Sequence, residues 1–228
     1  MTRNARTFII IPAYNEEQSI STVLQDLKKN GYENIAVIDD GSKDNTTKIA
    51  KAAGVTVLTH YINRGQGAAL RTGTEYALSK DADIIVHFDA DGQMRAEDIT
   101  TVIKPIIDGN SDVSFGSRFI GKQSNIPPLR KNLLLLGRIF MKLFFRIQTK
   151  DPQSGFRAFS KKAAQHIEIT QRGMTHCSEI LEQVHKNKLT FTEVPVTILY
   201  TDYSKKHGQN NLAALRIATK LLWSKLLK

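Results

Sequence analysis

Short apolar runs alternate with segments of helical periodicity through the first half of the chain. Residues 7–11, 35–38, 55–58, 84–88 and 112–116 are short runs rich in β-branched residues, a pattern typical of strands buried on both faces of a parallel sheet. Between them, residues 18–30, 45–53, 68–78 and 96–107 carry apolar side chains at a helical period. Alternation of this kind predicts an α/β fold with a doubly wound, mostly parallel sheet and helices on both faces.

The strand predicted over residues 84–88 ends in two carboxylates, Asp89 and Asp91, and the amide of Gln93 follows. Ligands of open α/β sheets bind beyond the carboxyl ends of the strands. Two like charges this close are costly unless a cation neutralises them, and Mg²⁺ or Mn²⁺ favours such oxygen ligands. A solvated polar turn has the same composition, but the buried strand before it and Gly92 after it favour a metal site.

The second half of the chain has a different pattern. After a loop containing Pro127 and Pro128, residues 130–148 form a basic amphipathic pattern, and residues 212–228 form another that includes Trp223. Basic amphipathic helices lie in membrane interfaces, where Trp is favoured. Helices packed on a core with solvated Lys and Arg have the same pattern. The sequence predicts a turn that leads into a short strand over residues 151–159. It also predicts helices over residues 161–167 and 177–187 and a further strand over residues 191–199.

Length and cysteine content suggest one domain in a reducing compartment. The 228 residues are enough to bury a full core, so we expect a single domain over residues 1–228. Cys177, the one cysteine, rules out an internal disulfide framework. The first residues lead straight into a strand, not a signal peptide, and no apolar stretch approaches the roughly 18 residues of a spanning helix. We therefore expect a cytoplasmic protein that does not cross a membrane.

The net charge of +10 is unevenly distributed. Before Gly121 there are 13 Lys and Arg against 16 Asp and Glu, and from Gly121 onward 19 against 6. A basic half beside an acidic half indicates a polyanionic partner: phospholipid, nucleic acid or a phosphorylated substrate.

The loop at residues 63–67 contains Gly65 and Gly67 but matches neither common phosphate-binding fingerprint. It lacks the third glycine of the dinucleotide motif and the Lys-Ser/Thr pair of the P-loop. It is therefore either a tight turn before a helix or a place where the backbone approaches a ligand closely.

Six stretches, taken together, resemble family 2 glycosyltransferases of the GT-A fold, and among them dolichyl- and polyprenyl-phosphate mannose synthase-like enzymes. In the family's order they are Ile-Pro-Ala-Tyr-Asn-Glu at 11–16, Val-Ile-Asp-Asp-Gly-Ser at 37–42, Gly-Ala-Ala-Leu-Arg at 67–71, Asp-Ala-Asp-Gly-Gln at 89–93, Gly-Ser-Arg-Phe at 116–119 and Gln-Ser-Gly-Phe-Arg at 153–157. The resemblance implies an inverting enzyme that moves a hexose, mannose from GDP-mannose in the first place, to a polyprenyl (dolichyl) phosphate at the cytoplasmic membrane face.

The resemblance also implies roles for individual residues. It makes residues 1–120 the nucleotide-sugar-binding half and residues 121–228 the acceptor-binding, membrane-facing half. The implied donor-binding residues are Pro12, Ala13, Tyr14, Glu16, Ile38, Asp40, Asp89, Ala90 and Asp91. The implied ligands of Mg²⁺ or Mn²⁺ are Asp89, Asp91 and Gln93, and the implied catalytic residues are Asp91 and Arg118. The implied acceptor-phosphate residues are Arg118, Arg130, Lys131, Lys205 and Lys206, each of which is otherwise a solvated surface cation.

The chemistry of the acceptor separates the competing interpretations. A hydroxyl acceptor needs a general base, whereas a lipid phosphate, with a second pKa of about 6, is already anionic. Glu179 and Glu182 are the nearest possible bases, and both fit a helix surface better. The alternative function is transfer to a glycan or protein hydroxyl, for example from UDP-glucose.

Other partners follow from the charge distribution. A nucleic-acid-binding protein would also use the basic half, but the ordered donor-site motifs argue against one, so we expect no nucleic acid partner. We expect peripheral docking on an anionic membrane surface, or a membrane-anchoring partner, because many related enzymes carry carboxyl-terminal membrane helices that this sequence lacks. The histidines show no metal-ligand spacing, and we expect His176 and His185 at the surface.

Overall fold

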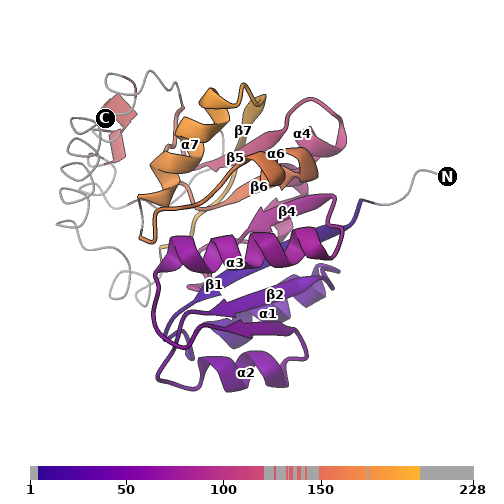
Figure 1. Cartoon of the computed structure of the whole chain (residues 1–228), viewed down its shortest axis with the longest axis vertical. Helices are drawn as coiled ribbons and strands as arrows, with labels where there is room; N and C mark the ends of the chain where they lie inside the picture. Colours follow the sequence, from indigo (N-terminus) through magenta and orange to yellow (C-terminus); the bar gives the residue numbers. More distant parts are fainter. Residues whose placement is uncertain are drawn as a thin grey trace.

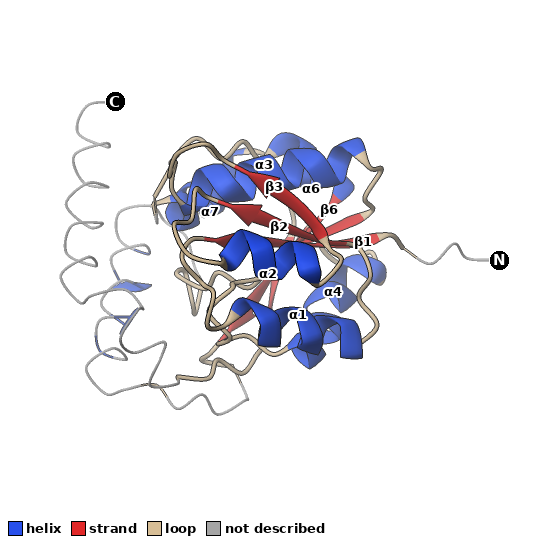
Figure 2. Cartoon of the chain, turned by 90° about the horizontal axis from the view of Figure 1, so that it is seen from below, coloured by secondary structure: helices blue, strands red, loops and turns tan. Residues whose placement is uncertain are grey.

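The computed structural model describes residues 5–120, 149–173 and 175–200, together with isolated positions between 126 and 142. In this part of the chain, helices cover both faces of one sheet (Figures 1 and 2). The strands are β1 Thr7–Ala13, β2 Ile35–Asp39, β3 Thr56–Thr59, β4 Ile84–His87, β5 Val113–Ser117, β6 Arg157–Ser160 and β7 Phe191–Pro195. The helices are α1 Ile20–Lys29, α2 Thr46–Ala52, α3 Gln66–Ser79, α4 Ile99–Ile107, α6 Lys161–His166 and α7 His176–Lys186.

The sheet is mostly parallel, as the sequence predicts. Its described strands follow the order β3-β2-β1-β4-β6-β5-β7. Parallel pairs join β1 to β2 and β4, β2 to β3, and β5 to β7. The exception is β6, which lies antiparallel between β4 and β5. Because β6 lies between them, β4 and β5 are not neighbours in the sheet, although they are the fourth and fifth strands predicted from the sequence.

Two apolar layers, one on each face, hold the helices to the sheet. On β1, Ile9 and Ile11 pack with residues of α1, α2 and α4, whereas Phe8 and Ile10 pack with residues of α3, α6 and α7. Successive side chains of a strand point to opposite faces, and both faces are covered here. Because both faces of β1 are buried, its sequence is a continuous run of apolar residues.

Helix α3 lies very close to the sheet because glycine faces it. A Cβ atom at Gly73 would lie 2.1 Å from Cγ2 of Ile10, and one at Gly67 would lie 1.9 Å from the carbonyl oxygen of Gln171. The amide of Gly67 donates to the carbonyl of Arg172 (2.8 Å). The first turn of α3 is thereby joined to the segment that precedes α7.

Some predicted boundaries differ from the observed ones. Helix α2 spans Thr46–Ala52, whereas the sequence predicts 45–53. Asp44, which precedes it, accepts hydrogen bonds from the amides of Thr46 (3.0 Å) and Glu17 (3.1 Å). The last described strand ends at Pro195 and not at residue 199, because the amide of Thr197 turns toward Asp98 (2.7 Å).

The two predicted basic helices fall largely or wholly outside the described residues. Within 130–148, the described positions 132, 134, 135, 138, 139 and 142 are helical. Residues 212–228 lie outside the described part. Among the described helices, none has both the length and the apolar composition needed to cross a bilayer.

Candidate active site

A cleft of about 360 Å³ lies where β1, β2 and β4 end. This is the edge of an α/β sheet at which ligands bind. Of the predicted donor and metal residues, the cleft is lined by Pro12, Ala13, Tyr14, Glu16, Asp40, Asp89, Ala90, Asp91 and Gln93. The structure thus brings together side chains that follow three different strands. Ile38 is not among the lining residues, because it is fully buried in β2 and packs under α3 at Gly73.

Asp89 and Asp91 line the cleft just after the end of β4. Oδ1 of Asp89 accepts a hydrogen bond from Nε2 of Gln66 (3.0 Å), and Oδ1 of Asp91 accepts one from the amide of Gln93 (3.0 Å). Burial, and then the charge of Asp91, raise the pKa of Asp89 to about 7. The site therefore favours a cation that would offset the paired carboxylates.

This donor set suits a divalent cation that is shared with a phosphate ligand. Among the described residues, no group of three His, Cys, Asp or Glu side chains could enclose a metal ion by itself. Two carboxylates and the amide of Gln93 line the cleft instead. Mg²⁺ is commonly held by one or two carboxylates, with substrate phosphates and water completing its octahedron.

Asp40 organises the loop on the β2 side of the cleft. Its Oδ1 accepts from Nδ1 of His60 (2.7 Å) and the amide of Arg64 (2.9 Å), and its Oδ2 accepts from the amide of Gly65 (2.6 Å). Nε2 of His60 lies 2.9 Å from the hydroxyl of Thr72 in α3. Because a carboxylate has about four lone-pair sites, most of the capacity of Asp40 serves the loop of residues 60–65.

Replacing His60 by leucine should lower the free energy of unfolding by about 1–3 kcal/mol, because the buried carboxylate of Asp40 then loses a donor. The amide of His60→Asn can take the place of Nδ1, so this variant should keep more than half of that stability. Urea denaturation measures both. Equal losses in the two variants, or no loss in either, would contradict this role of His60.

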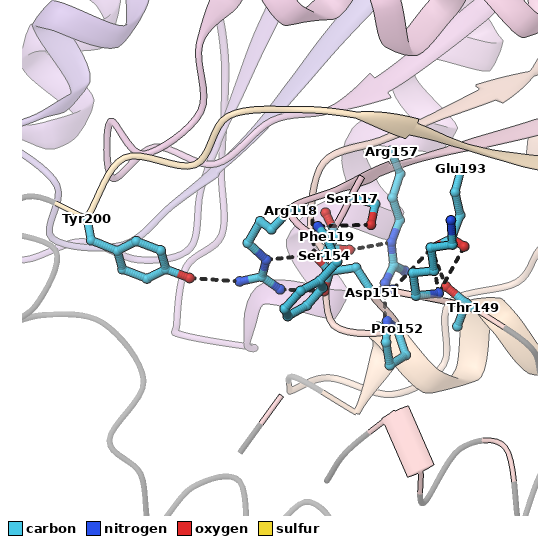
Figure 3. Close-up of polar contacts among 11 residues, drawn as sticks. Ser117, Arg118, Phe119, Thr149, Asp151, Pro152, Ser154, Arg157, Glu193 and Tyr200 are labelled. Atoms are coloured by element: carbon cyan, nitrogen blue, oxygen red, sulfur yellow. Dashed lines mark hydrogen bonds and ion pairs between the residues drawn. The ribbon is translucent and has the colours of Figure 1, made fainter. Parts of the chain in front are cut away.

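Arg118 reaches the cleft as one half of a buried ion pair (Figure 3). Its Nε and Nη2 donate to the two carboxylate oxygens of Asp151 (2.6 Å each), and its Nη1 donates to the hydroxyl of Tyr200 (3.1 Å). Burial by itself lowers the pKa of Arg118, but Asp151 outweighs burial and raises it above its usual range. Arg118 is therefore charged, and Asp151 compensates that charge.

Comparison with known proteins identifies the family. The profile of glycosyl transferase family 2 matches residues 8–168. The chain belongs to glycosyl transferase family 2. It is 39% identical, over 96% of both chains, to the UDP-N-acetylglucosamine–dolichyl-phosphate N-acetylglucosaminyltransferase of Methanococcus voltae. It is 33% identical to the dolichol-phosphate mannosyltransferase of Pyrococcus furiosus, over 94% of this chain and 63% of that protein.

A solved structure confirms the GT-A fold. Glucosyl-3-phosphoglycerate synthase from Mycobacterium tuberculosis, crystallised with Mn²⁺, UDP and glucosyl-3-phosphoglycerate, superposes with a TM-score of 0.74. The two proteins share 18% identity, and the match covers 96% of this chain and 78% of that one. Both the fold class and the family predicted from the sequence are thereby confirmed.

In this family 2 glycosyltransferase, the side of the cleft opposite Asp40 is built by the turn before β6 and by the first turn of α7. The turn is held by the buried Arg157, which donates from Nε to the carbonyl of Ser154 (2.7 Å; Figure 3). The guanidinium of Arg157 also lies over the ring of Phe115. Glu193 fixes its start by accepting from the amides of Lys150 and Asp151 (2.8 and 3.0 Å).

His176 and Cys177 open α7 and line the same side of the cleft. The prediction that His176 lies at the surface is wrong, because its side chain is buried between Gly173, whose carbonyl lies 2.9 Å from Nδ1, and Cys177. Burial alone raises the pKa of Cys177, but His176, together with the charges of Arg157 and Arg118, more than offsets this and the pKa falls to about 6. No motif around these residues signals their position. His185 is exposed, as predicted.

Glu179 and Glu182, the possible bases for a hydroxyl acceptor, are not among the described residues that line the cleft. Glu179 accepts hydrogen bonds from the amides of Thr170 (3.1 Å) and Gln171 (3.0 Å), and Glu182 is exposed. Neither lines the cleft, which agrees with their interpretation as helix-surface residues. Arg130, Lys131, Lys205 and Lys206 lie outside the described residues.

Proposed function

We propose that this family 2 glycosyltransferase transfers a sugar from a nucleotide sugar to a polyprenyl phosphate, with Mg²⁺ or Mn²⁺ held by Asp89, Asp91 and Gln93. The observation that carries the proposal is that Asp89 and Asp91 line the cleft just after β4, the strand that lies between β1 and β6 in the sheet. On one side of them stand the residues that follow β1 and β2. On the other stand the turn before β6 and the start of α7.

The donor would lie across the ends of β1, β2 and β4. Pro12, Ala13, Tyr14 and Glu16 offer a wall for the nucleoside beside the loop that Asp40 holds. Gln66 fixes the carboxylate of Asp89 by its hydrogen bond, and the diphosphate would lie beside this carboxylate. When bound, the cation would supply stabilisation of the negative charge that grows on the diphosphate leaving group.

The distribution of carboxylates supports a phosphate acceptor. Among the described lining residues, the acids are Glu16, Asp40, Asp89 and Asp91, all of which follow β1, β2 or β4. On the β6 and α7 side, Asp151 is engaged by Arg118. A hydroxyl acceptor would need a general base there. An anionic phosphate oxygen needs none, and its single displacement at the sugar C1 atom would invert the configuration.

We propose UDP-N-acetylglucosamine as the first donor to test, because the Methanococcus voltae relative named for it matches the chain over 96% of its length. GDP-mannose, which the sequence resemblance favours, is the second, supported by the relative named for mannosyl transfer. The acceptor is a membrane lipid, so we also propose peripheral association through the basic half, whose residues 121–228 carry 19 Lys and Arg against 6 Asp and Glu, directly or through an anchoring partner.

The test is transfer of labelled sugar into an organic-extractable lipid. Full-length protein, Mn²⁺ and polyprenyl phosphate are incubated with UDP-N-acetylglucosamine, GDP-mannose or UDP-glucose in parallel. We expect label in the lipid phase from UDP-N-acetylglucosamine, and its loss when EDTA removes the cation. A parallel reaction contains a glycan or protein acceptor. If label appears only on that acceptor, and disappears in Glu179→Gln or Glu182→Gln, the acceptor is a hydroxyl and not a phosphate.

A further inference from the structure

Ser154 carries a buried hydroxyl group at the wall of the cleft. The residue is 3% exposed, it lines the cleft, and its Oγ has no hydrogen-bonding partner in the described structure. Buried polar side chains are nearly always hydrogen-bonded, because an unpaired one carries the full cost of desolvation. A ligand in the cleft would remove this cost.

The amide and the carbonyl of Ser154 are both hydrogen-bonded, so its hydroxyl is the polar group of this residue that has no partner in the described structure. The amide of Ser154 donates to the carbonyl of Asp151 (3.2 Å), and its carbonyl accepts from Nε of Arg157 (2.7 Å). Figure 3 shows Ser154 within this set of contacts. The side chain is therefore presented on a fixed support, which is the property of a residue that recognises a substrate.

The turn that carries Ser154 packs against Asp89. Gly155 follows Ser154, and a Cβ atom at Gly155 would lie only 2.9 Å from Oδ2 of Asp89. The absence of a side chain at Gly155 thus allows the turn to approach Asp89. Along the cleft, the group that follows a nucleoside beside Tyr14 and a diphosphate at Asp89 and Asp91 is the sugar.

The surroundings of Ser154 suit a neutral ligand group. Two described cations lie near Ser154. Arg118 is compensated by Asp151, and Arg157 donates from Nε and Nη2 to the carbonyls of Ser154 and Pro152 and does not line the cleft. The amide of Gln153 lines the cleft. Hydroxyl and amide groups of a sugar make the neutral hydrogen bonds that such a wall offers. A second phosphate would instead call for unpaired positive charge.

We propose that Oγ of Ser154 hydrogen-bonds a hydroxyl or amide group of the sugar being transferred, and that Ser154 is therefore a specificity-determining residue. This inference rests on the proposed function, because it takes the bound ligand to be a nucleotide sugar. It assigns Ser154 to the sugar and not to the nucleotide.

Ser114 provides a matched control. It is fully buried in β5, and its Oγ also has no partner in the described structure, but it does not line the cleft. Ser154→Ala and Ser114→Ala therefore remove the same group from the same kind of surroundings. Neither variant should have a thermal unfolding midpoint below that of the parent protein, because each loses an unpaired buried hydroxyl.

The experiment is calorimetric titration of the full-length protein with Mn²⁺ and either UDP or UDP-N-acetylglucosamine, repeated with GDP and GDP-mannose. We expect Ser154→Ala to bind the free nucleotide as the parent does and to bind the nucleotide sugar about tenfold more weakly, the usual effect of one lost hydrogen bond to a ligand. Ser114→Ala should leave both affinities unchanged.

Three results would overturn the assignment: unchanged sugar-nucleotide affinity in Ser154→Ala, equal weakening of nucleotide and nucleotide sugar, or the same loss in Ser114→Ala. None of these results contradicts the proposed function if the parent protein transfers sugar to lipid. If the parent protein binds neither nucleotide sugar, the proposed function fails, and the assignment of Ser154 fails with it.

Discussion

Asp91→Asn should reduce sugar transfer about a thousandfold and leave the fold intact. The substitution keeps an oxygen that can accept the hydrogen bond from the amide of Gln93 (3.0 Å), so the turn after β4 should persist. It removes the charge that the cation would bind. Lewis-acid stabilisation of a leaving group contributes several kcal/mol, and each 1.36 kcal/mol corresponds to about tenfold in rate.

The measurement pairs the transfer rate with Mn²⁺ binding in the presence of UDP. Asp81→Asn is the matched control, because it removes the same charge from an exposed residue that pairs with Lys161. Asp81 has a positive φ of 55°, which asparagine tolerates. Transfer that persists in Asp91→Asn, or that falls equally in Asp81→Asn, would show that the carboxylate of Asp91 does not hold a catalytic cation.

Asp151→Ala should lower the free energy of unfolding by about 3–5 kcal/mol, the usual cost of breaking a buried ion pair by removing one partner. The side chain of Asp151 is fully buried and that of Arg118 is 7% exposed. The alanine variant leaves the guanidinium buried without its carboxylate. The backbone amide of Arg118, which donates to Oδ2 of Asp151 (3.1 Å), also loses its acceptor.

The double variant Arg118→Met/Asp151→Ala separates the charge effect from the loss of packing. Because it leaves no buried charge, we expect it to recover most of the stability that Asp151→Ala loses. Urea denaturation measures both variants. A double variant as unstable as the single one would contradict a role for the pair in charge compensation. A stable double variant that no longer transfers sugar would show that Arg118 also acts on a substrate.

The central part of the site is predictable from the sequence because its signals are local. A run of β-branched residues followed by Asp89 and Asp91 indicates both a buried strand and the chemistry at its end. The same reasoning places Tyr14 and Asp40 after their strands, and the structure brings all of these residues into one cleft. Ile38 lies in the core and not in the cleft, because it is still inside β2 and packs under α3 at Gly73, whereas Asp40 comes after the end of the strand.

The supporting contacts are not predictable in this way. His60 binds Asp40 across 20 residues, and Asp151 binds Arg118 across 33. Neither spacing has a periodicity that a sequence pattern can reveal. The burial of His176 likewise depends on how the segment before α7 packs against the start of α3.

By itself, the sequence determined the α/β class, the location of most helices and strands, the family and the acidic strand end that lines the cleft. These properties depend on residues close together in the chain, where alternation, helical period and short motifs act directly. Only the tertiary structure decided that β6 lies between β4 and β5, that Arg118 is neutralised by Asp151, and that Ser154 and His176 line the cleft. Those properties depend on which distant segments meet, and that is set by the packing of the whole sheet and its helices.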